Sequence, residues 1–183
     1  IYAGGADFDT LDYSMATDGV FLNMQGGFAD TILADGTQVQ DFISGFERIV
    51  GSSYADGFTG DSAANIFEGG AGDDYFRGRG GIDTYRGGAG QDFYEFLVKD
   101  VLVDGHHYGV DTILDFNTSD AIDLHDFIKT EPAALSDVVR MSVSGADTTV
   151  SVKVGESFVD VVRLANFQAT DVDLLGADGM FIY

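Results

Sequence analysis

The chain has 183 residues, of which 45% are hydrophobic, which is enough to bury a core in one or two domains and argues against intrinsic disorder. Its 31 Asp and Glu residues against 9 Lys and Arg give a formal net charge of −22, which disfavours nucleic acid and anionic membrane surfaces as partners. The absence of cysteine excludes disulfides and thiolate metal sites, and no apolar run is long enough to span a bilayer.

Residues 1–50 are predicted to form a β-rich lead-in that contains a partial repeat. The segments DTLDYS (9–14) and GVFLNM (19–24) alternate apolar and polar residues as strands do. The opening IYA before a glycine pair reads as the end of one repeat and the start of another, so the chain is expected to be part of a longer protein. The segment FISGFERIV (42–50) leads directly into the next region.

Residues 51–96 contain five consecutive nonapeptides without a slip, GSSYADGFT, GDSAANIFE, GGAGDDYFR, GRGGIDTYR and GGAGQDFYE. The first place is always Gly. The sixth place holds Asp56, Asn65, Asp74, Asp83 and Asp92, and the eighth holds Phe58, Phe67, Phe76, Tyr85 and Tyr94. Such self-similarity at a fixed period is typical of repeat architectures.

The period predicts a coil of alternating turns and strands. Six glycine-rich residues make a turn that reaches positive φ, and three make a short strand whose middle residue points inward. Strands on alternate sides of a flattened coil then form two parallel sheets, in which every second nonapeptide is a neighbour. The ninth places support this pairing, because Glu68 falls beside Arg86 and Arg77 beside Glu95, with opposite charges 18 residues apart.

The sixth-place residues are predicted to stack from turn to turn. Asp56 lies over Asp74, Asn65 over Asp83 and Asp74 over Asp92 in this arrangement. Bare carboxylates at that spacing repel, so a stable structure needs a cation between them. Carboxylates together with turn carbonyls make an all-oxygen shell, which suits Ca²⁺ better than Mg²⁺ or zinc. The alternative is a glycine-rich linker with solvated charges.

Residues 97–183 are predicted to cap the roll. Short helices are expected at 124–129 and 133–138, the second after the single proline. The segment 140–164 gives three alternating strands joined by glycine-containing turns, which would cover the open end of the roll. The whole chain is therefore expected to be all-β, a parallel β-roll between two β-rich flanks.

The repeat resembles the RTX (haemolysin-type) calcium-binding pattern G-G-x-G-x-D-x-U-x. The resemblance implies a parallel β-roll that holds several Ca²⁺ ions between turns, with ligands from the carbonyls at places two and four and the carboxylate at place six. Carried over to this chain, the well-matched ligands are Gly70, Gly72, Asp74, Arg79, Gly81, Asp83, Gly88, Gly90 and Asp92. The first two nonapeptides depart from the pattern, so weaker or partial sites are expected at Ser52, Tyr54, Asp56, Asp61, Ala63 and Asn65.

The flanks resemble those of serralysin-type secreted proteins. In that group a glycine turn before the first strand shares a calcium with a Glu ahead of the roll, which implies Gly4, Gly45 and Glu47 as ligands here, with Asp7 and Asp9 competing for the carboxylate role. The segment GVDTILDFNTSDAIDLHDF (109–127) resembles the C-terminal signature of the same group. Asp111 is expected as a ligand beyond Asp92, and Asp104 beyond Asp83.

Three further acidic residues are open alternatives. Asp115, Asp120 and Asp123 are either additional ligands or turn and cap residues. The adjacent His106 and His107 lack an evident third metal ligand, so they are interpreted as an exposed loop, and His125 is the remaining histidine. No H-E-x-x-H, G-x-S-x-G or cysteine nucleophile is present, and the chain is predicted not to be an enzyme.

The resemblance implies a calcium-dependent folding module of a larger protein that is secreted by the type I (ABC) machinery, and the final TDVDLLGADGMFIY resembles an uncleaved export signal. Two alternatives remain. One is a module that binds an extracellular polysaccharide such as alginate, for which an exposed basic or aromatic stripe is expected, with Arg77, Arg79 and Arg86 as the candidates. The other is the tail of a serralysin-like zinc protease whose catalytic part lies outside these residues.

Overall fold

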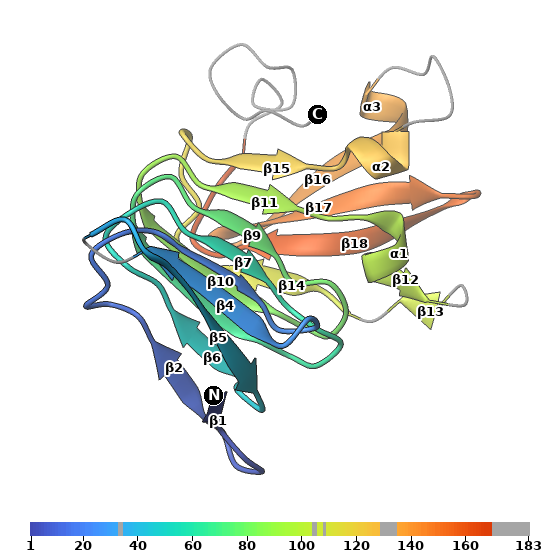
Figure 1. Cartoon of the computed structure of the whole chain (residues 1–183). Helices are drawn as coiled ribbons and strands as arrows, with labels where there is room; N and C mark the ends of the chain where they lie inside the picture. Colours follow the sequence, from blue (N-terminus) through green and yellow to red (C-terminus); the bar gives the residue numbers. More distant parts are fainter. Residues whose placement is uncertain (33–34, 104–105, 108, 129–134, 170–183) are drawn as a thin grey trace.

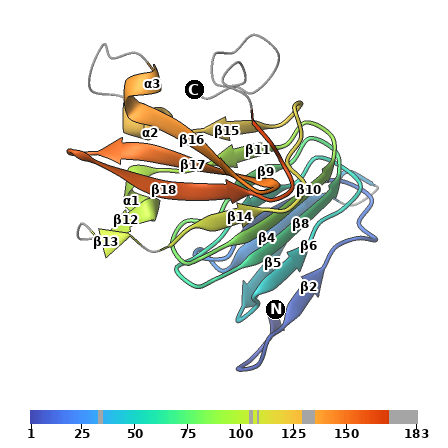
Figure 2. The same ribbon diagram turned by 180° about the vertical axis from the view of Figure 1, so that it is seen from behind.

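The computed structural model describes residues 1–32, 35–103, 106–107, 109–128 and 135–169. Within these ranges two long sheets lie face to face (Figures 1 and 2). Sheet I contains, in spatial order, β1 (Tyr2–Ala3), β5 (Gln38–Ser44), β4 (Phe28–Ile32), β3 (Val20–Asn23), β7 (Gly57–Thr59), β9 (Tyr75–Arg77), β11 (Phe93–Glu95) and β15 (Ala121–Asp123). Sheet II contains β16 (Val139–Ser144), β17 (Asp147–Val154), β18 (Ser157–Leu164), β14 (Asp111–Ile113), β10 (Thr84–Ala89), β8 (Ile66–Ala71), β6 (Arg48–Val50) and β2 (Thr10–Asp12).

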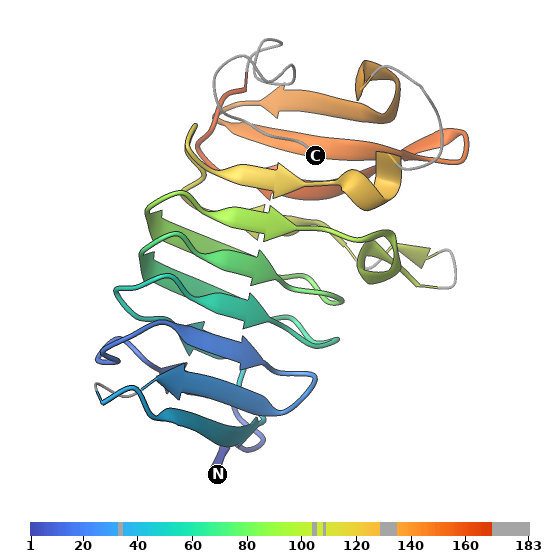
Figure 3. The ribbon, with the colours of Figure 1, turned by 45° about the horizontal axis from the view of Figure 1, so that its top comes forward.

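The predicted parallel β-roll is confirmed. Successive nonapeptides alternate between the sheets, and each strand pairs in parallel with the strand two repeats away, as Phe58 does with Phe76 and Phe67 with Tyr85. Figure 3 shows the strands of sheet I stacked as rungs from the N-terminal end to the C-terminal cap. Both sheets continue beyond residues 51–96, because β3 and β6 precede the repeats and β14 and β15 follow them in the same parallel arrangement.

The core of the roll is a column of eighth-place aromatic rings. All five are at most 1% exposed. Their rings stack along one sheet, with centroids 5.4 Å apart for Phe58 and Phe76 and 5.1 Å for Phe76 and Tyr94, and they also touch between the sheets, at 5.8 Å for Phe58 and Phe67. Burying one such side chain contributes about 1.5–3 kcal/mol, and its ring contacts contribute about 0.5–1.5 kcal/mol more.

The turn glycines are required for two different physical reasons. Gly70 and Gly72 have φ of 115° and 118°, a region that side chains rarely adopt. Gly69 has no such φ, but a Cβ placed on it would lie 2.0 Å from Oδ2 of Asp74 in the same nonapeptide. The first place is therefore glycine because the sixth-place carboxylate folds back onto it.

The N-terminal region adds an antiparallel element that the sequence did not predict. The expected strands at 9–14 and 19–24 are confirmed as β2 and β3. However, β3, β4 and β5 form an antiparallel meander at the edge of sheet I, with β1 parallel to β5 beyond it. This region thus extends one sheet by hairpins, whereas β2 and β6 extend the other by parallel strands.

The C-terminal cap has the predicted elements. The helices α2 (His125–Ile128) and α3 (Leu135–Val138) and the three strands β16, β17 and β18 lie within the expected segments. The cap strands are antiparallel to one another, but β18 joins β14 in parallel and so attaches the cap to the roll. The helix α1 (Val98–Val101) and the short hairpin of β12 (Leu102–Val103) and β13 (His106–His107) were not predicted.

One of the two predicted ninth-place ion pairs is wrong. Arg77 and Glu95 lie 3.3 Å apart, as expected. Glu68 and Arg86 are in register, but Glu68 pairs with Arg48 at 2.8 Å, and Arg86 lies 3.8 Å from Asp115. Both new partners come from strands or turns outside the five nonapeptides, so the repeat spacing carried no sign of them.

Candidate metal-binding turns

The sixth-place residues of the nonapeptides and the equivalent residues of the flanking strands form two rows. One row lies at the start of the strands of each sheet. Row I contains Val20, Asp56, Asp74, Asp92 and Asp120, and row II contains Asp9, Glu47, Asn65, Asp83 and Asp111. Within a row, a carboxylate accepts a hydrogen bond from the backbone N–H of the preceding member. Asp56 N–H donates to Asp74 Oδ1 at 2.8 Å and Asp74 N–H donates to Asp92 Oδ1 at 3.1 Å.

The second carboxylate oxygen distinguishes the turns at Asp74 and Asp92, whereas at Asp83 it accepts from the Tyr85 hydroxyl at 3.5 Å. Asp74 and Asp92 are 1% and 2% exposed, and the Oδ2 of each is buried without a hydrogen-bond partner among the described residues. A buried charged oxygen that is left unpaired is costly, and native structures pair such groups with a hydrogen bond, another charge or a metal ion. These two oxygens are therefore candidates for contact with a cation.

Burial raises the pKa of four of the row carboxylates, Asp74, Asp83, Asp92 and Asp111, well above their ordinary value. It raises the pKa of Asp74 to about 7 and that of Asp83 to about 8, and the neighbouring carboxylates in the same rows add to both shifts. Burial also raises the pKa of Asp111 to about 7 and that of Asp92 to about 6. Without a counter-ion, the folded protein thus favours protonated carboxyls in both rows.

The turn carbonyls of successive repeats are packed closely enough to leave no room for side chains. A Cβ on Gly88 would lie 2.2 Å from the carbonyl oxygen of Gly70, and one on Gly90 would lie 2.0 Å from that of Gly72. On the other side of the roll, a Cβ on Gly81 would lie 2.4 Å from the carbonyl oxygen of Ala63. Arg79 occupies a second place with φ of 72°, where the other well-matched repeats have glycine. The predicted carbonyl ligands are therefore stacked from turn to turn.

The first nonapeptide satisfies its carboxylate with protein hydrogen bonds. Asp56 Oδ2 accepts from Ser52 N–H at 2.6 Å, and its Oδ1 accepts from Ser52 Oγ at 2.9 Å and from Val20 N–H at 2.7 Å. The carbonyl of Tyr54 accepts from the same serine hydroxyl at 3.4 Å. This turn therefore has less need of a cation than the turn at Asp74.

The second nonapeptide likewise differs from the turns that follow it. Asn65 Oδ1 accepts from Asp61 N–H at 3.2 Å, and Asp61 Oδ1 accepts from Ala63 N–H at 2.8 Å. An amide at this place carries no charge. In the first and second nonapeptides, the departures from the repeat pattern thus coincide with local hydrogen bonds to the sixth-place side chain.

The predicted N-terminal residues come together around Asp9 rather than Asp7. Asp9 N–H donates to Glu47 Oε2 at 2.9 Å, and the Asp9 carbonyl accepts from Glu47 N–H at 3.2 Å. Gly4 and Gly45 are adjacent, because a Cβ on Gly4 would lie 1.8 Å from the Gly45 carbonyl oxygen. Asp7 is exposed.

The rows continue past the last nonapeptide through Asp111 and Asp120. Asp83 N–H donates to Asp111 Oδ1 at 2.8 Å, and Asp92 N–H donates to Asp120 Oδ1 at 3.1 Å, each across 28 residues. The sequence had suggested that Asp111 follows Asp92. In the structure it follows Asp83 instead. Asp104 lies outside the described residues.

The other two open candidates already have protein partners. Asp115 accepts from Gly87 N–H at 3.0 Å and from Gly88 N–H at 3.2 Å. Asp123 lies 2.7 Å from His125 Nδ1. These contacts are of the kind expected for turn and cap residues.

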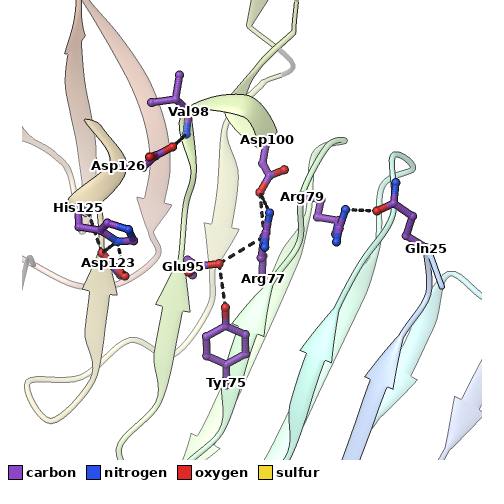
Figure 4. Close-up of polar contacts among 10 residues, drawn as sticks. All are labelled: Gln25, Tyr75, Arg77, Arg79, Glu95, Val98, Asp100, Asp123, His125 and Asp126. Atoms are coloured by element: carbon purple, nitrogen blue, oxygen red, sulfur yellow. Dashed lines mark hydrogen bonds and ion pairs between the residues drawn. The ribbon is translucent and has the colours of Figure 1, made fainter. Parts of the chain in front are cut away.

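The arginine stripe expected for a polysaccharide site is wrong. Arg77 lies on β9 of sheet I and Arg86 on β10 of sheet II, so they face opposite sides of the roll. Figure 4 shows Arg77 held between Glu95 and Asp100, and Arg79 in contact with Gln25. The sequence predicted Glu95 as a partner of Arg77 but gave no sign of Asp100, or of Asp115 beside Arg86.

The ligand chemistry of the rows is oxygen only. Within the described ranges, no three His, Asp or Glu side chains come together as a metal-binding group, so a site here depends on backbone carbonyls as well. The backbone of His106 and His107 forms β13, but their side chains are not described. None of the described helices has the length and apolar content to cross a bilayer.

No model of a known protein family matches the chain, and no curated protein matches it. Several solved structures resemble it, and two of them are subunits of one enzyme. One is the AlgE6R2 subunit of the mannuronan C5-epimerase from Azotobacter vinelandii, with 27% identity over 74% of this chain and 92% of that subunit and a TM-score of 0.33. The other is the AlgE6R3 subunit of the same epimerase, with 25% identity over 72% of this chain and 88% of that subunit and a TM-score of 0.28.

Proposed function

We propose that this chain is a non-catalytic calcium-binding β-roll module of the RTX type, which folds when its turns bind Ca²⁺. The observation that carries the proposal is a pair of buried oxygens, Oδ2 of Asp74 and Oδ2 of Asp92, which have no hydrogen-bond partner in the described part of the chain and lie in turns whose carbonyls are stacked. Carboxylate and carbonyl oxygens in a flexible set of six to eight are what Ca²⁺ prefers, whereas Mg²⁺ needs stricter octahedral geometry and zinc prefers nitrogen or sulfur.

The residues that would hold the ions follow from the rows. On the row I side they are the carbonyls of Gly70, Gly72, Gly88 and Gly90 with the carboxylates of Asp74 and Asp92, and on the row II side the carbonyls of Arg79 and Gly81 with Asp83 and Asp111. The group around Gly4, Asp9, Gly45 and Glu47 is a further candidate. A bound Ca²⁺ supplies positive charge between carboxylates that otherwise repel.

The proposed mechanism is a calcium-dependent folding switch. Where calcium is scarce, the entropy of the glycine turns and the repulsion of the buried carboxylates oppose folding. Where calcium is abundant, ions bind only the folded chain and stabilise it by mass action. This behaviour suits a module that is exported unfolded by the type I machinery and folds outside the cell as part of a larger protein. Residues 170–183, which resemble an export signal, lie outside the described residues.

Isothermal titration with CaCl₂ tests the proposal directly. We expect saturable binding of more than one Ca²⁺ per chain, with dissociation constants of about 10⁻⁴–10⁻³ M or tighter, the range of extracellular calcium modules. MgCl₂ titrated under the same conditions should give much weaker binding, because the stacked carbonyls do not offer a regular octahedron. Absence of calcium binding at 10 mM, a concentration about tenfold above that range, would refute the proposed function.

The pH dependence of the calcium-depleted protein gives a second prediction. The pKa of Asp74, Asp83 and Asp111 is about 7, 8 and 7 in the folded state against an ordinary 3.8, so the folded state binds more protons between these values. Stability contributed by protonation is then complete below about pH 4 and is lost as the pH rises through 7–8.

We therefore expect acidification from pH 8 to 5.5 to increase the strand signal and melting temperature of the calcium-depleted protein. In saturating calcium the same change should weaken stability, because ligand carboxylates must be deprotonated. Circular dichroism melts at both pH values test this. A calcium-depleted melting temperature that stays constant or falls on acidification would contradict it.

A further inference from the structure

The outer face of sheet I carries two rows of side chains that point away from the core. The residues between them, such as Leu22, Phe58 and Phe76, are buried. One outer row runs across five paired strands and contains Phe21, Gly57, Tyr75, Phe93 and Ala121. The next outer row along the strands contains Asn23, Thr59, Arg77, Glu95 and Asp123. An aromatic row thus lies beside a polar one.

A pocket interrupts the aromatic row at Gly57. It has a volume of about 250 Å³ and is lined by Phe21, Asn23, Phe28, Gly57, Thr59 and Tyr75, with Leu22 at its base. Gly57 has no side chain, so no third side chain lies between Phe21 and Tyr75 in this row. Phe21 leans over this strand, because a Cβ on Gly57 would lie 2.9 Å from its Cδ1, and the Phe21 side of the pocket is open to solvent.

Tyr75 forms a preorganised wall of this pocket. Its ring stacks on Phe93 with centroids 5.8 Å apart and an interplanar angle of 14°. Its hydroxyl donates to Glu95 Oε2 at 2.8 Å, and Glu95 also contacts Arg77 (Figure 4). Because the ring is fixed on one face and at its hydroxyl, a ligand would meet it with little loss of side-chain freedom.

The charge around the pocket favours an uncharged ligand. No Lys, Arg, Asp or Glu is among the lining residues. The adjacent Arg77 is already neutralised by Glu95 at 3.3 Å and Asp100 at 2.7 Å, and the whole chain carries a net charge of −22. An anionic ligand would therefore meet the net negative charge of the chain and no cationic side chain among the lining residues.

The lining combines aromatic rings with a hydroxyl and an amide. A sugar ring presents an apolar C–H face together with a rim of hydroxyls, which matches rings on the walls and hydrogen-bonding groups at Asn23 and Thr59. Asn23 Oδ1 already accepts from Gly26 N–H at 2.8 Å, so its amide NH₂ is oriented as a donor.

We propose that this pocket binds one sugar ring of a neutral polysaccharide between Phe21 and Tyr75. The proposal goes beyond calcium binding, and it differs from a polyanion site because it uses no arginine. The turns that bind calcium lie at the ends of the strands, and the pocket lies on the outer face of sheet I. Calcium would act on it only by folding the sheet.

The test uses the calcium-saturated chain, titrated by calorimetry with neutral hexasaccharides of glucose, mannose and xylose and with an alginate hexasaccharide. We expect at least one neutral oligosaccharide to bind and alginate not to bind. Phe21→Ala should weaken binding about tenfold, which corresponds to the loss of one aromatic contact. Phe42→Ala is the matched control, because Phe42 is 61% exposed against 58% for Phe21 but does not line the pocket.

Circular dichroism of each variant in calcium separates failure of this proposal from failure of the proposed function. If calcium folds the variants but no neutral sugar binds the unaltered chain, the pocket proposal is overturned and calcium binding stands. Equal losses for Phe21→Ala and Phe42→Ala, preferential binding of alginate, or binding of a phenylalanine-containing peptide in place of sugar would each overturn it as well.

Discussion

The calcium-depleted chain is expected to lose its strand signal in far-ultraviolet circular dichroism and to regain it cooperatively as Ca²⁺ is added. The physical reason is that folding brings Asp74 and Asp92 into one buried row, where burial and neighbouring carboxylates raise the cost of ionising each of them. The aromatic column, by contrast, is buried only once consecutive turns have closed, so neither part forms alone. We expect the transition at about 10⁻⁴–10⁻³ M calcium.

Two controls separate ion binding from charge screening. NaCl matched in ionic strength screens exposed charges but acts much less on a buried pair, so it should not restore the signal. MgCl₂ at the same concentration should restore little of it. Full strand content in chelator would contradict the folding switch, although calcium could still bind a preformed roll. Restoration by NaCl would show that repulsion between exposed charges, and not occupancy of the turns, controls folding.

The stacked rows explain why the repeat made the fold predictable. The five nonapeptides stated the period, the inward aromatic and the neighbouring strand, and parallel registers such as Phe58 with Phe76 follow from these alone. The different reasons for the individual turn glycines could not be inferred from the sequence. Only the structure shows that Gly69 is fixed by the carboxylate of Asp74, whereas Gly70 is fixed by its φ.

The limits of the sequence interpretation lie where the spacing changes. Asp120 stands 28 residues after Asp92, so the period of nine does not find it. A shorter signal does, because an acidic residue comes directly before one outward and one buried apolar residue in Asp9-Thr10-Leu11, Glu47-Arg48-Ile49 and Asp120-Ala121-Ile122. The strand β3 is the exception, with Val20 at the acidic place. The turn length varies between these units, but the strand register does not.

The ion pairs to residues outside the nonapeptides and the hairpins were beyond this kind of inference. Arg48 forms an ion pair with Glu68, and Asp115 forms one with Arg86. In each pair, one partner comes from a segment outside the repeat. The meander of β3, β4 and β5 shows no fixed period, and its register depends on hairpins whose turns the sequence did not specify. Such contacts depend on which chain segments end up adjacent, which a repeat rule states only within the repeat.

Asp74→Asn is expected to have opposite effects with and without calcium. Asp74 sits in the middle of row I, where its Oδ1 accepts the Asp56 N–H at 2.8 Å and its Oδ2 has no partner among the described residues. An amide keeps the first interaction through its carbonyl oxygen but removes the charge. In calcium, the midpoint of folding should rise about tenfold or more and the number of bound ions should fall, because ligand charge sets affinity in such sites.

In calcium-depleted buffer the same substitution should instead stabilise any residual structure, because it removes one buried carboxylate from between Asp56 and Asp92. Asp73→Asn is the matched control. It makes the same change of charge one residue away, on an exposed side chain whose Oδ1 accepts from Gln91 N–H at 2.8 Å, a bond that asparagine can keep. Calcium titrations followed by circular dichroism distinguish the two variants. If Asp74→Asn lowered stability equally in both buffers, or if Asp73→Asn matched it, Asp74 would be a structural residue and not a calcium ligand.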